Sequence, residues 1–260
     1  MRQIRYDAII SDMEFSYSRL TAFDSCKYKW LMKYILGVPS VKDGFFSTYG
    51  TFLHDIFAKY YRGEGSVAAL SNYYINEYCN QVVGKPQKMT TAVNYFNQGF
   101  EAVLNLKPTP YEILGVEKEV HWKLGGRDYV GYIDLLLRSE DGIIIVDHKN
   151  RDLKPRSTRA KPTKTDEELS QYLRQLYMYA TPVYEEYGIH PISLQFNVYR
   201  TGVQIKERFD MQEYEKTLQW AVDKADEIER NDDWSPNIDY FGCRYLCDVR
   251  NECEYNNLGR

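Results

Sequence analysis

One short stretch, GIIIVDHK at residues 142–149, limits the folds that are open to this chain. The branched aliphatic residues Ile143 to Val146 are typical of a strand that is buried on both faces. The strand then ends in Asp147, His148 and Lys149, although an unpaired charge in a protein interior is costly. Another part of the chain, or a bound ion, must therefore compensate these charges.

The spacing of apolar residues predicts the order of helices and strands. Up to about residue 106, apolar side chains recur every three or four positions, which predicts about four helices, the first beginning at Ser16 and ending before Gly37. From residue 111, segments rich in β-branched and aromatic residues predict an antiparallel meander over 111–124, 127–138 and 142–149. A helix from 166 to about 187, a strand over 191–200 and a helix over 211–230 are predicted to follow.

At 260 residues, 43% of them hydrophobic, the chain is long enough for one elaborated domain. We expect a single domain over 1–260, with a helical section over 1–110, a core over 111–230 and a cysteine-rich tail over 231–260. The formal net charge of −4 argues against a uniformly basic coat for nucleic acid. Because the sequence shows neither the apolar core of a signal peptide nor the roughly 18 apolar residues of a membrane span, we expect a cytoplasmic protein that contacts no membrane.

A partner for the charged end of the strand is available on the preceding predicted strand. Side chains alternate along a strand, so Asp147 and Lys149 share one face. A four-residue SEDG loop places Asp134 opposite Asp147, and a two-residue Asp-Gly turn places it opposite Lys149. Two adjacent carboxylates repel unless a cation lies between them, and Mg²⁺ or Mn²⁺ prefers oxygen ligands. The alternative is a bulge that leaves Asp134 in solvent and Lys149 in a surface salt bridge.

Three further motifs accompany these residues and resemble a known family. Gly131-x-x-Asp134 followed by Asp147-x-Lys149 resembles the core of the PD-(D/E)xK nuclease superfamily. The segments GTFLHDIF and QLYMY resemble two motifs of its RecB-type subgroup and contain His54, Gln175 and Tyr179. The resemblance covers nearly the whole chain. It implies an α/β, restriction-endonuclease-like core, in which a mixed central sheet with an antiparallel meander is flanked by helices.

The resemblance also implies roles for these residues. The side chains of His54, Asp134 and Asp147 and the backbone carbonyl of His148 would hold one or two Mg²⁺ or Mn²⁺ ions. Position 148 departs from the family, which usually has an aromatic or aliphatic residue there. The catalytic group would comprise Asp134 and Asp147 together with Lys149, Gln175 and Tyr179. Glu117 and Glu119 share one strand face, and the sequence does not select which of them joins the site.

The cysteines suggest a second metal centre. Cys243, Cys247 and Cys253 are spaced C-x3-C-x5-C, and a reducing compartment favours metal ligation or burial over disulfides. In RecB-type nucleases that carry an iron–sulfur cluster, an N-terminal cysteine supplies the fourth ligand from a segment similar to YSRLTAFDSCKYKW, which here gives Cys26. The family tail more often reads C-x2-C-x5-C. The resemblance implies a 4Fe–4S cluster, with structural zinc or unligated thiols as alternatives. Cys79 is predicted to be a core residue.

The segment that follows the charged strand is basic. Residues 149–164 contain seven lysines and arginines and one acid, Asp152. Such a run is usually a solvated loop, but its position beside the proposed site favours binding to DNA phosphates. The residues proposed for this are Arg151, Lys154, Arg156, Arg159 and Lys161.

The resemblance implies a metal-dependent DNA exonuclease that acts on single-stranded ends, like RecB-type and CRISPR-associated adaptation nucleases. The alternative is a catalytically silent module that binds DNA or assembles complexes with the same fold. The sequence identifies no protein partner.

Overall fold

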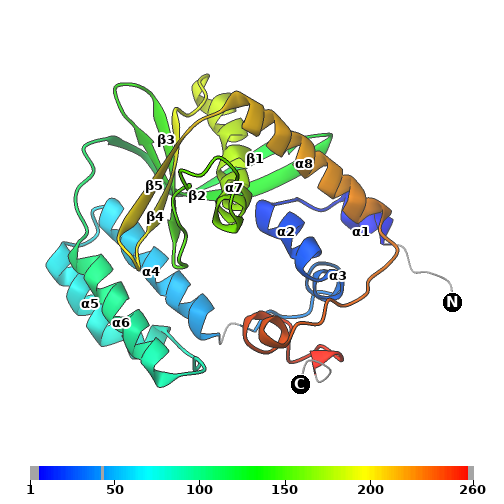
Figure 1. Ribbon diagram of the computed structural model, residues 1–260, viewed down its shortest axis with the longest axis horizontal. Coiled ribbons are helices and arrows are strands. Elements are labelled where there is room, and N and C mark those ends of the chain that lie inside the picture. Colours follow the sequence, from blue (N-terminus) through cyan, green and yellow to red (C-terminus); the bar gives the residue numbers. More distant parts are fainter. Residues whose placement is uncertain (1–5, 42–43, 257–260) are drawn as a thin grey trace. The chain divides into compact units, whose positions relative to one another are not determined.

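The computed structural model describes residues 6–41 and 44–256 (Figure 1). The outer limits of the predicted sections, at residues 1 and 260, lie outside these ranges, and the single-domain organisation stays a prediction. The chain forms two compact units. The terminal unit comprises Met1–Gly44, His121–Gly131 and Lys216–Arg260, and the core unit comprises Phe45–Val120 and Tyr132–Glu215.

The order of elements agrees with the predicted order. The first group of helices is α1 (Asp7–Ser11), α2 (Tyr17–Ser25), α3 (Lys27–Trp30), the π-helix η1 (Leu31–Ile35), α4 (Phe45–Tyr61), α5 (Val67–Gln81) and α6 (Met89–Leu104). The strands and remaining helices are β1 (Glu112–Leu124), β2 (Arg127–Arg138), β3 (Ile143–Lys149), α7 (Lys164–Tyr187), β4 (Ser193–Val198), β5 (Val203–Arg208), α8 (Met211–Arg230) and the π-helix η2 (Gly242–Leu246).

The strands form one mixed sheet in the order β1-β2-β3-β4-β5. Strand β3 pairs antiparallel with β2 and parallel with β4, and β5 pairs antiparallel with β4. A parallel pair needs a long crossover, which α7 provides between β3 and β4. The sheet and its flanking helices confirm the expected α/β class. Helix α1, strand β5 and the π-helix η2 are additions that the sequence did not predict.

Strand β3 is the centre of the core unit. Ile143 to Val146 are at most 7% exposed, as the apolar run predicts. Beyond them, alternate side chains point to opposite faces of the sheet. Lys149 contacts Gln175 of α7, whereas the ring of His148 packs on Phe57 of α4. Two different helices therefore cover the two faces of the charged end of β3.

Helices α5 and α6 pack against α4 through aromatic side chains and lie side by side in Figure 1. In α5 the buried residues include Tyr74 and Tyr78, which lie one helical turn apart. Cys79 follows Tyr78 by about 100° around the helix axis, away from this buried stripe, and is exposed. The prediction that Cys79 is a core residue was therefore wrong.

In the terminal unit, the helix predicted from Ser16 is divided into α2, α3 and η1. The break lies at Cys26, whose backbone is extended (φ −168°, ψ 112°) and which caps α3. The C-terminal segment lies beside these helices (Figure 1), where the indoles of Trp30 and Trp234 stack with ring centroids 5.6 Å apart. Asp248 forms ion pairs with Lys29 and Lys33.

Within residues 6–41 and 44–256, no helix combines the length and the apolar character that a membrane crossing requires.

Candidate active site

The β2–β3 hairpin brings two acids together. Arg138 pairs with Ile143 across the loop 139–142, so SEDG forms the four-residue connection that was one of two predicted alternatives. The same register pairs Leu135 with Val146 and thus places Asp134 opposite Asp147. Both carboxylates are buried, at 8% and 3% exposure. The alternative in which a bulge directs Asp134 into solvent was therefore wrong.

Glu117 of β1 lies beside these acids because its backbone is irregular. Its φ is +49°, a left-handed conformation that residues with a Cβ rarely adopt. Two residues earlier, a Cβ at Gly115 would lie 2.9 Å from the side chain of Lys118, so the glycine allows a tight bend. Glu117 approaches His54, whereas Glu119 is exposed. The geometry thus distinguishes two acids that strand alternation left equivalent.

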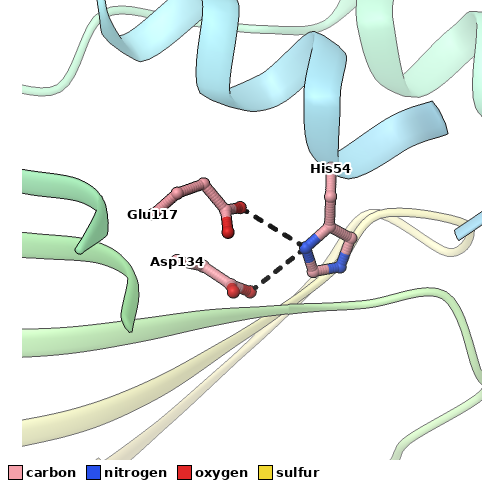
Figure 2. Close-up of side chains that lie close together, drawn as sticks. All are labelled: His54, Glu117 and Asp134. Atoms are coloured by element: carbon pink, nitrogen blue, oxygen red, sulfur yellow. Dashed lines mark ion pairs between the residues drawn. The ribbon is translucent and has the colours of Figure 1, made fainter. Parts of the chain in front are cut away.

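His54 of α4 completes a group of metal-ligand atoms. Its Nδ1 atom lies 3.7 Å from Glu117 Oε1 and 3.6 Å from Asp134 Oδ2, and Figure 2 shows both carboxylates directed at this one nitrogen. The donor atoms of His54, Glu117 and Asp134 all lie within 4.8 Å of one another. A histidine nitrogen and two carboxylates suit a divalent cation such as Mn²⁺ or Mg²⁺.

The backbone of His148 holds two of these side chains. Its N–H donates to Asp134 Oδ2 at 2.6 Å, and its carbonyl accepts from His54 Nε2 at 3.0 Å. Because a carbonyl can only accept, the proton of neutral His54 resides on Nε2, and the Nδ1 lone pair faces the acids. The carbonyl that the resemblance implied as a metal contact thus orients a proposed metal ligand.

The imidazole ring of His148 faces away from the acids. It stacks on Tyr61 with ring centroids 6.0 Å apart, and its Nδ1 lies 3.3 Å from the side-chain nitrogen of Asn197, which can donate to it. Burial, together with the positive charges of His54 and Lys149, lowers the pKa of His148 to about 3. The His148 ring is therefore neutral near pH 7.

Charges at the site are mutually dependent. Burial raises the pKa of Asp134 to about 7, and repulsion from Asp147 contributes to this rise. Burial alone would lower the pKa of His54, but Glu117, Asp134 and Asp147 raise it to about 9. Without a metal ion, Asp134 and His54 therefore tend to hold protons near pH 7. A divalent cation would have to displace those protons in order to bind.

Lys149 is fixed by residues from two elements. Its Nζ atom lies 2.8 Å from Asp147 Oδ2 as an ion pair and donates a hydrogen bond to Gln175 Oε1 at 3.0 Å. The Gln175 amide in turn donates to Tyr179 Oη at 3.0 Å. The Q-x-x-x-Y pair of α7 is therefore linked to the lysine of the hairpin through Gln175, and the structure brings together the predicted catalytic residues on this face of the sheet.

The basic segment 151–164 has its own internal order. Asp166 of α7 accepts hydrogen bonds from the Thr163 hydroxyl and from the backbone N–H groups of Ser157 and Thr163, all at 2.7 Å, and these bonds hold the pKa of Asp166 well below its usual range. Arg151 pairs with Glu168 and Arg156 with Glu207, each at 2.9 Å. These two arginines are therefore partly neutralised.

The other proposed phosphate ligands, Lys154, Arg159 and Lys161, are exposed. A surface pocket of about 550 Å³ includes Arg156 and Arg159 together with Arg174 of α7, which the sequence analysis did not single out.

A separate cavity lies in the terminal unit. It has a volume of about 420 Å³ and is lined by all four predicted cluster ligands, Cys26, Cys243, Cys247 and Cys253. The Cys26 sulfur accepts two backbone N–H groups, from Lys29 and Asn237, each at 3.4 Å. Burial raises the pKa of the Cys253 thiol, and the nearby thiols of Cys26 and Cys243 raise it further. Thiols from both ends of the chain thus face one space.

Comparison with known proteins agrees with this geometry. The sequence profile of the PD-(D/E)XK nuclease superfamily matches residues 14–254. Among solved structures, a candidate exonuclease from Eubacterium rectale has a similar fold, with a TM-score of 0.55, 12% sequence identity, and coverage of 95% of this chain and 90% of that chain. No curated protein matches the chain. Because the profile spans nearly the whole sequence and includes the hairpin acids, His54 and α7, the chain belongs to the PD-(D/E)XK nuclease superfamily.

Proposed function

We propose that the chain is a divalent-metal-dependent deoxyribonuclease that hydrolyses phosphodiester bonds at single-stranded DNA ends. The observation that carries this proposal is the position of three metal-ligand side chains, His54, Glu117 and Asp134, beside the Asp147–Lys149 ion pair. A cytoplasmic location accompanies the proposal, since DNA would be the substrate.

The side chains fit a divalent cation. Asp134 and Asp147 are both buried, and their repulsion contributes to the raised pKa of Asp134, which a cation between them would relieve. The His54 Nδ1 lone pair and the carboxylates of Glu117, Asp134 and Asp147 would hold one or two Mg²⁺ or Mn²⁺ ions. A bound ion would lower the pKa of a coordinated water and polarise the scissile phosphate.

The remaining residues act through position and charge. Lys149, fixed by Asp147 and Gln175, would place an ammonium group beside the scissile phosphate and offset negative charge that develops there. Tyr179 restrains Gln175 and so limits the movement of the lysine. The exposed cations Lys154, Arg159 and Lys161, with Arg151 and Arg156, would contact DNA phosphates along the approach to the site.

The thiol cavity would hold a 4Fe–4S cluster. Cys26, Cys243, Cys247 and Cys253 line one cavity and supply the four thiolates that such a cluster requires. A structural zinc ion, which takes the same four ligands, stays the alternative.

A direct test uses the purified full-length protein and single-stranded oligonucleotides labelled at either the 5′ or the 3′ end. We expect stepwise loss of nucleotides with Mg²⁺ or Mn²⁺ and none with EDTA, and the label that is released first gives the polarity. Binding of the oligonucleotide without cleavage under every metal condition would contradict the proposal and favour a catalytically silent DNA-binding module.

A further inference from the structure

A second cavity of the core unit has no role in the proposed hydrolysis. It has a volume of about 640 Å³, within the range of roughly 300–1,000 Å³ that is common for small-molecule sites. Helices α4 and α6, the end of β4 and the turn that follows β4 form its walls. Its position on the α4 side of β3 separates it from Lys149, which faces α7.

The lining of this cavity is rich in carboxamides. Each carboxamide offers a donor and an acceptor in one plane, the arrangement that pairs with the edge of a nucleobase. The Tyr61 ring in the same wall is partly exposed and offers a surface against which a base can pack, whereas the rings of Phe57 and Tyr199 are buried. The carboxamides are Asn97, Gln98, Asn105, Asn197 and Gln204; because Gln98, Asn105 and Asn197 already form side-chain hydrogen bonds within the chain, Asn97 and Gln204 are the ones that remain for a base.

Two further lining residues offer a ligand no free hydrogen-bonding atom. The Arg200 guanidinium is already engaged, since it donates to Gln98 Oε1 at 2.9 Å and to Tyr95 Oη at 2.8 Å and lies over the Tyr95 ring. The Tyr199 side chain is 4% exposed, and its hydroxyl oxygen is buried away from the cavity surface. Polar recognition in this cavity therefore depends on the exposed carboxamides of Asn97 and Gln204.

The cavity adjoins the metal-ligand group through His148. Phe57, Tyr61 and Asn197 line the cavity and also contact the His148 ring, while the His148 backbone holds His54 and Asp134.

The distance between the two sites follows from α4. His54 and Tyr61 are seven residues apart on this helix, a separation of about 10 Å, which about three stacked nucleotides at 3.4 Å each would span. A strand whose phosphate lies at the metal site can therefore extend to the cavity.

We infer that this cavity binds a nucleobase, which an unpaired DNA strand supplies from a nucleotide about three positions from the scissile phosphate. The inference rests on the proposed function, because the strand must occupy the metal site for this spacing to apply. The same base chemistry could come from a free deoxynucleotide, and the experiment below separates the two sources.

The test measures equilibrium binding of short single-stranded oligonucleotides to the full-length protein in EDTA, by fluorescence anisotropy. A single abasic position is moved inward from each end. Loss of the base that occupies the cavity should weaken binding about tenfold, in line with the stacking of one base on aromatic residues, and other positions should have smaller effects. Because the measurement requires no cleavage, a protein that binds the strand without hydrolysing it would still show the loss at one position, and the labelled-oligonucleotide assay tests hydrolysis separately.

A double variant, Asn97→Ala/Gln204→Ala, identifies the cavity as the source of the effect. Both residues are exposed, so the fold should be retained. The variant should bind the intact strand about as weakly as the wild type binds the strand with the sensitive abasic position. Binding of that abasic strand to the variant should be no weaker still. The matched control is Asn94→Ala/Gln81→Ala, which removes two exposed carboxamides outside the cavity and should bind like the wild type.

The second arm tests deoxynucleoside monophosphates by equilibrium dialysis with the same variants. Binding that requires Asn97 and Gln204, together with a flat abasic scan, would establish base recognition with a free nucleotide as its source. A flat scan without monophosphate binding, or effects that persist unchanged in the double variant, would overturn the inference.

Discussion

The proposed metal site of the core unit and the thiol cavity of the terminal unit are assembled in different ways. In the core unit, the β3 backbone holds His54 and Asp134 through bonds of 3.0 and 2.6 Å, within a sheet whose central strand is buried from Ile143 to His148. In the terminal unit, the three C-terminal thiols belong to a segment that contributes little to a core. Among the described residues 231–256, only Val249 is buried, with 0% exposure.

The two sites should therefore depend on their metals in different ways, one for chemistry and the other for structure. The core site has its geometry fixed by a packed sheet, so removal of a divalent ion should abolish chemistry and leave the fold intact. The C-terminal segment relies on the Trp30–Trp234 stack, the ion pairs of Asp248 and, as we propose, a cluster that connects it to Cys26. Removal of the cluster should therefore affect structure first.

The largest expected effect tests the core site. Asp147→Asn keeps the volume of the side chain but removes the charge that pairs with Lys149 and would bind a cation, so DNA cleavage should fall by about 10³-fold or more. Release of labelled nucleotides measures activity, and circular dichroism with thermal unfolding measures the fold. Asp152→Asn, an exposed neighbour outside the motif, is the matched control. Cleavage at the wild-type rate by the Asp147 variant would exclude the proposed site.

The next effect tests the terminal unit. Protein purified anaerobically should be brown and contain about four irons per chain, as a four-thiolate cluster requires. Cys26→Ser should remove the colour and make residues 231–256 more sensitive to limited proteolysis, whereas Cys79→Ser, an exposed thiol on α5, should do neither. A colourless protein with one bound zinc would assign the same ligands to a structural zinc site, and metal-free protein would refute both assignments.

A third prediction concerns pH. The pKa of His54 is about 9 and that of Asp134 about 7 without a metal ion, so a cation must displace protons to bind. Affinity for Mn²⁺ should increase by about tenfold between pH 7 and 8, measured by calorimetry in two buffers to count the released protons. Affinity that does not change over this interval would show that His54 is not a ligand.

The same pKa values predict a change in the stability of the metal-free protein. Both pKa values are raised above their ordinary values of 6.5 and 3.8, so the stabilising contributions are present at low pH. The contribution of Asp134 is lost as pH rises through about 7 and that of His54 as pH rises through about 9. Denaturant unfolding should show this loss in EDTA and a smaller loss in Mn²⁺.

The smallest expected effect concerns the basic segment. Arg159→Ala/Lys161→Ala should weaken binding of single-stranded DNA similarly for every sequence and reduce the salt dependence by about 0.7 per phosphate contact removed. The exposed pair Lys85→Ala/Lys88→Ala provides a control with the same change in charge. An equal salt dependence in the two variants would mean that segment 151–164 only connects β3 to α7 and does not bind DNA phosphates.

The shared face of Asp134, Asp147 and Lys149 could be predicted, because it follows from side-chain alternation with either of the two even-length loops, whereas the structure selects the four-residue loop. Other features depend on tertiary structure. Strand β5, VQIKER, is short and mostly polar, and it is recognisable only as a partner of β4. The choice of Glu117 over Glu119 follows from a left-handed backbone at Glu117, for which Gly115 is the one local signal. The break at Cys26 was also hidden, because apolar residues continue at helical spacing on both sides of it.

The main-chain bonds of His148 also make this position useful for protein engineering. Its N–H and carbonyl hold Asp134 and His54, while its ring occupies an aromatic environment on the other face of the sheet. A non-natural aromatic residue carrying a nitrile could replace the imidazole without removing either main-chain bond. Its infrared frequency would then report the electric field next to the proposed metal site as cations and DNA are added, without a label on any of the proposed metal ligands.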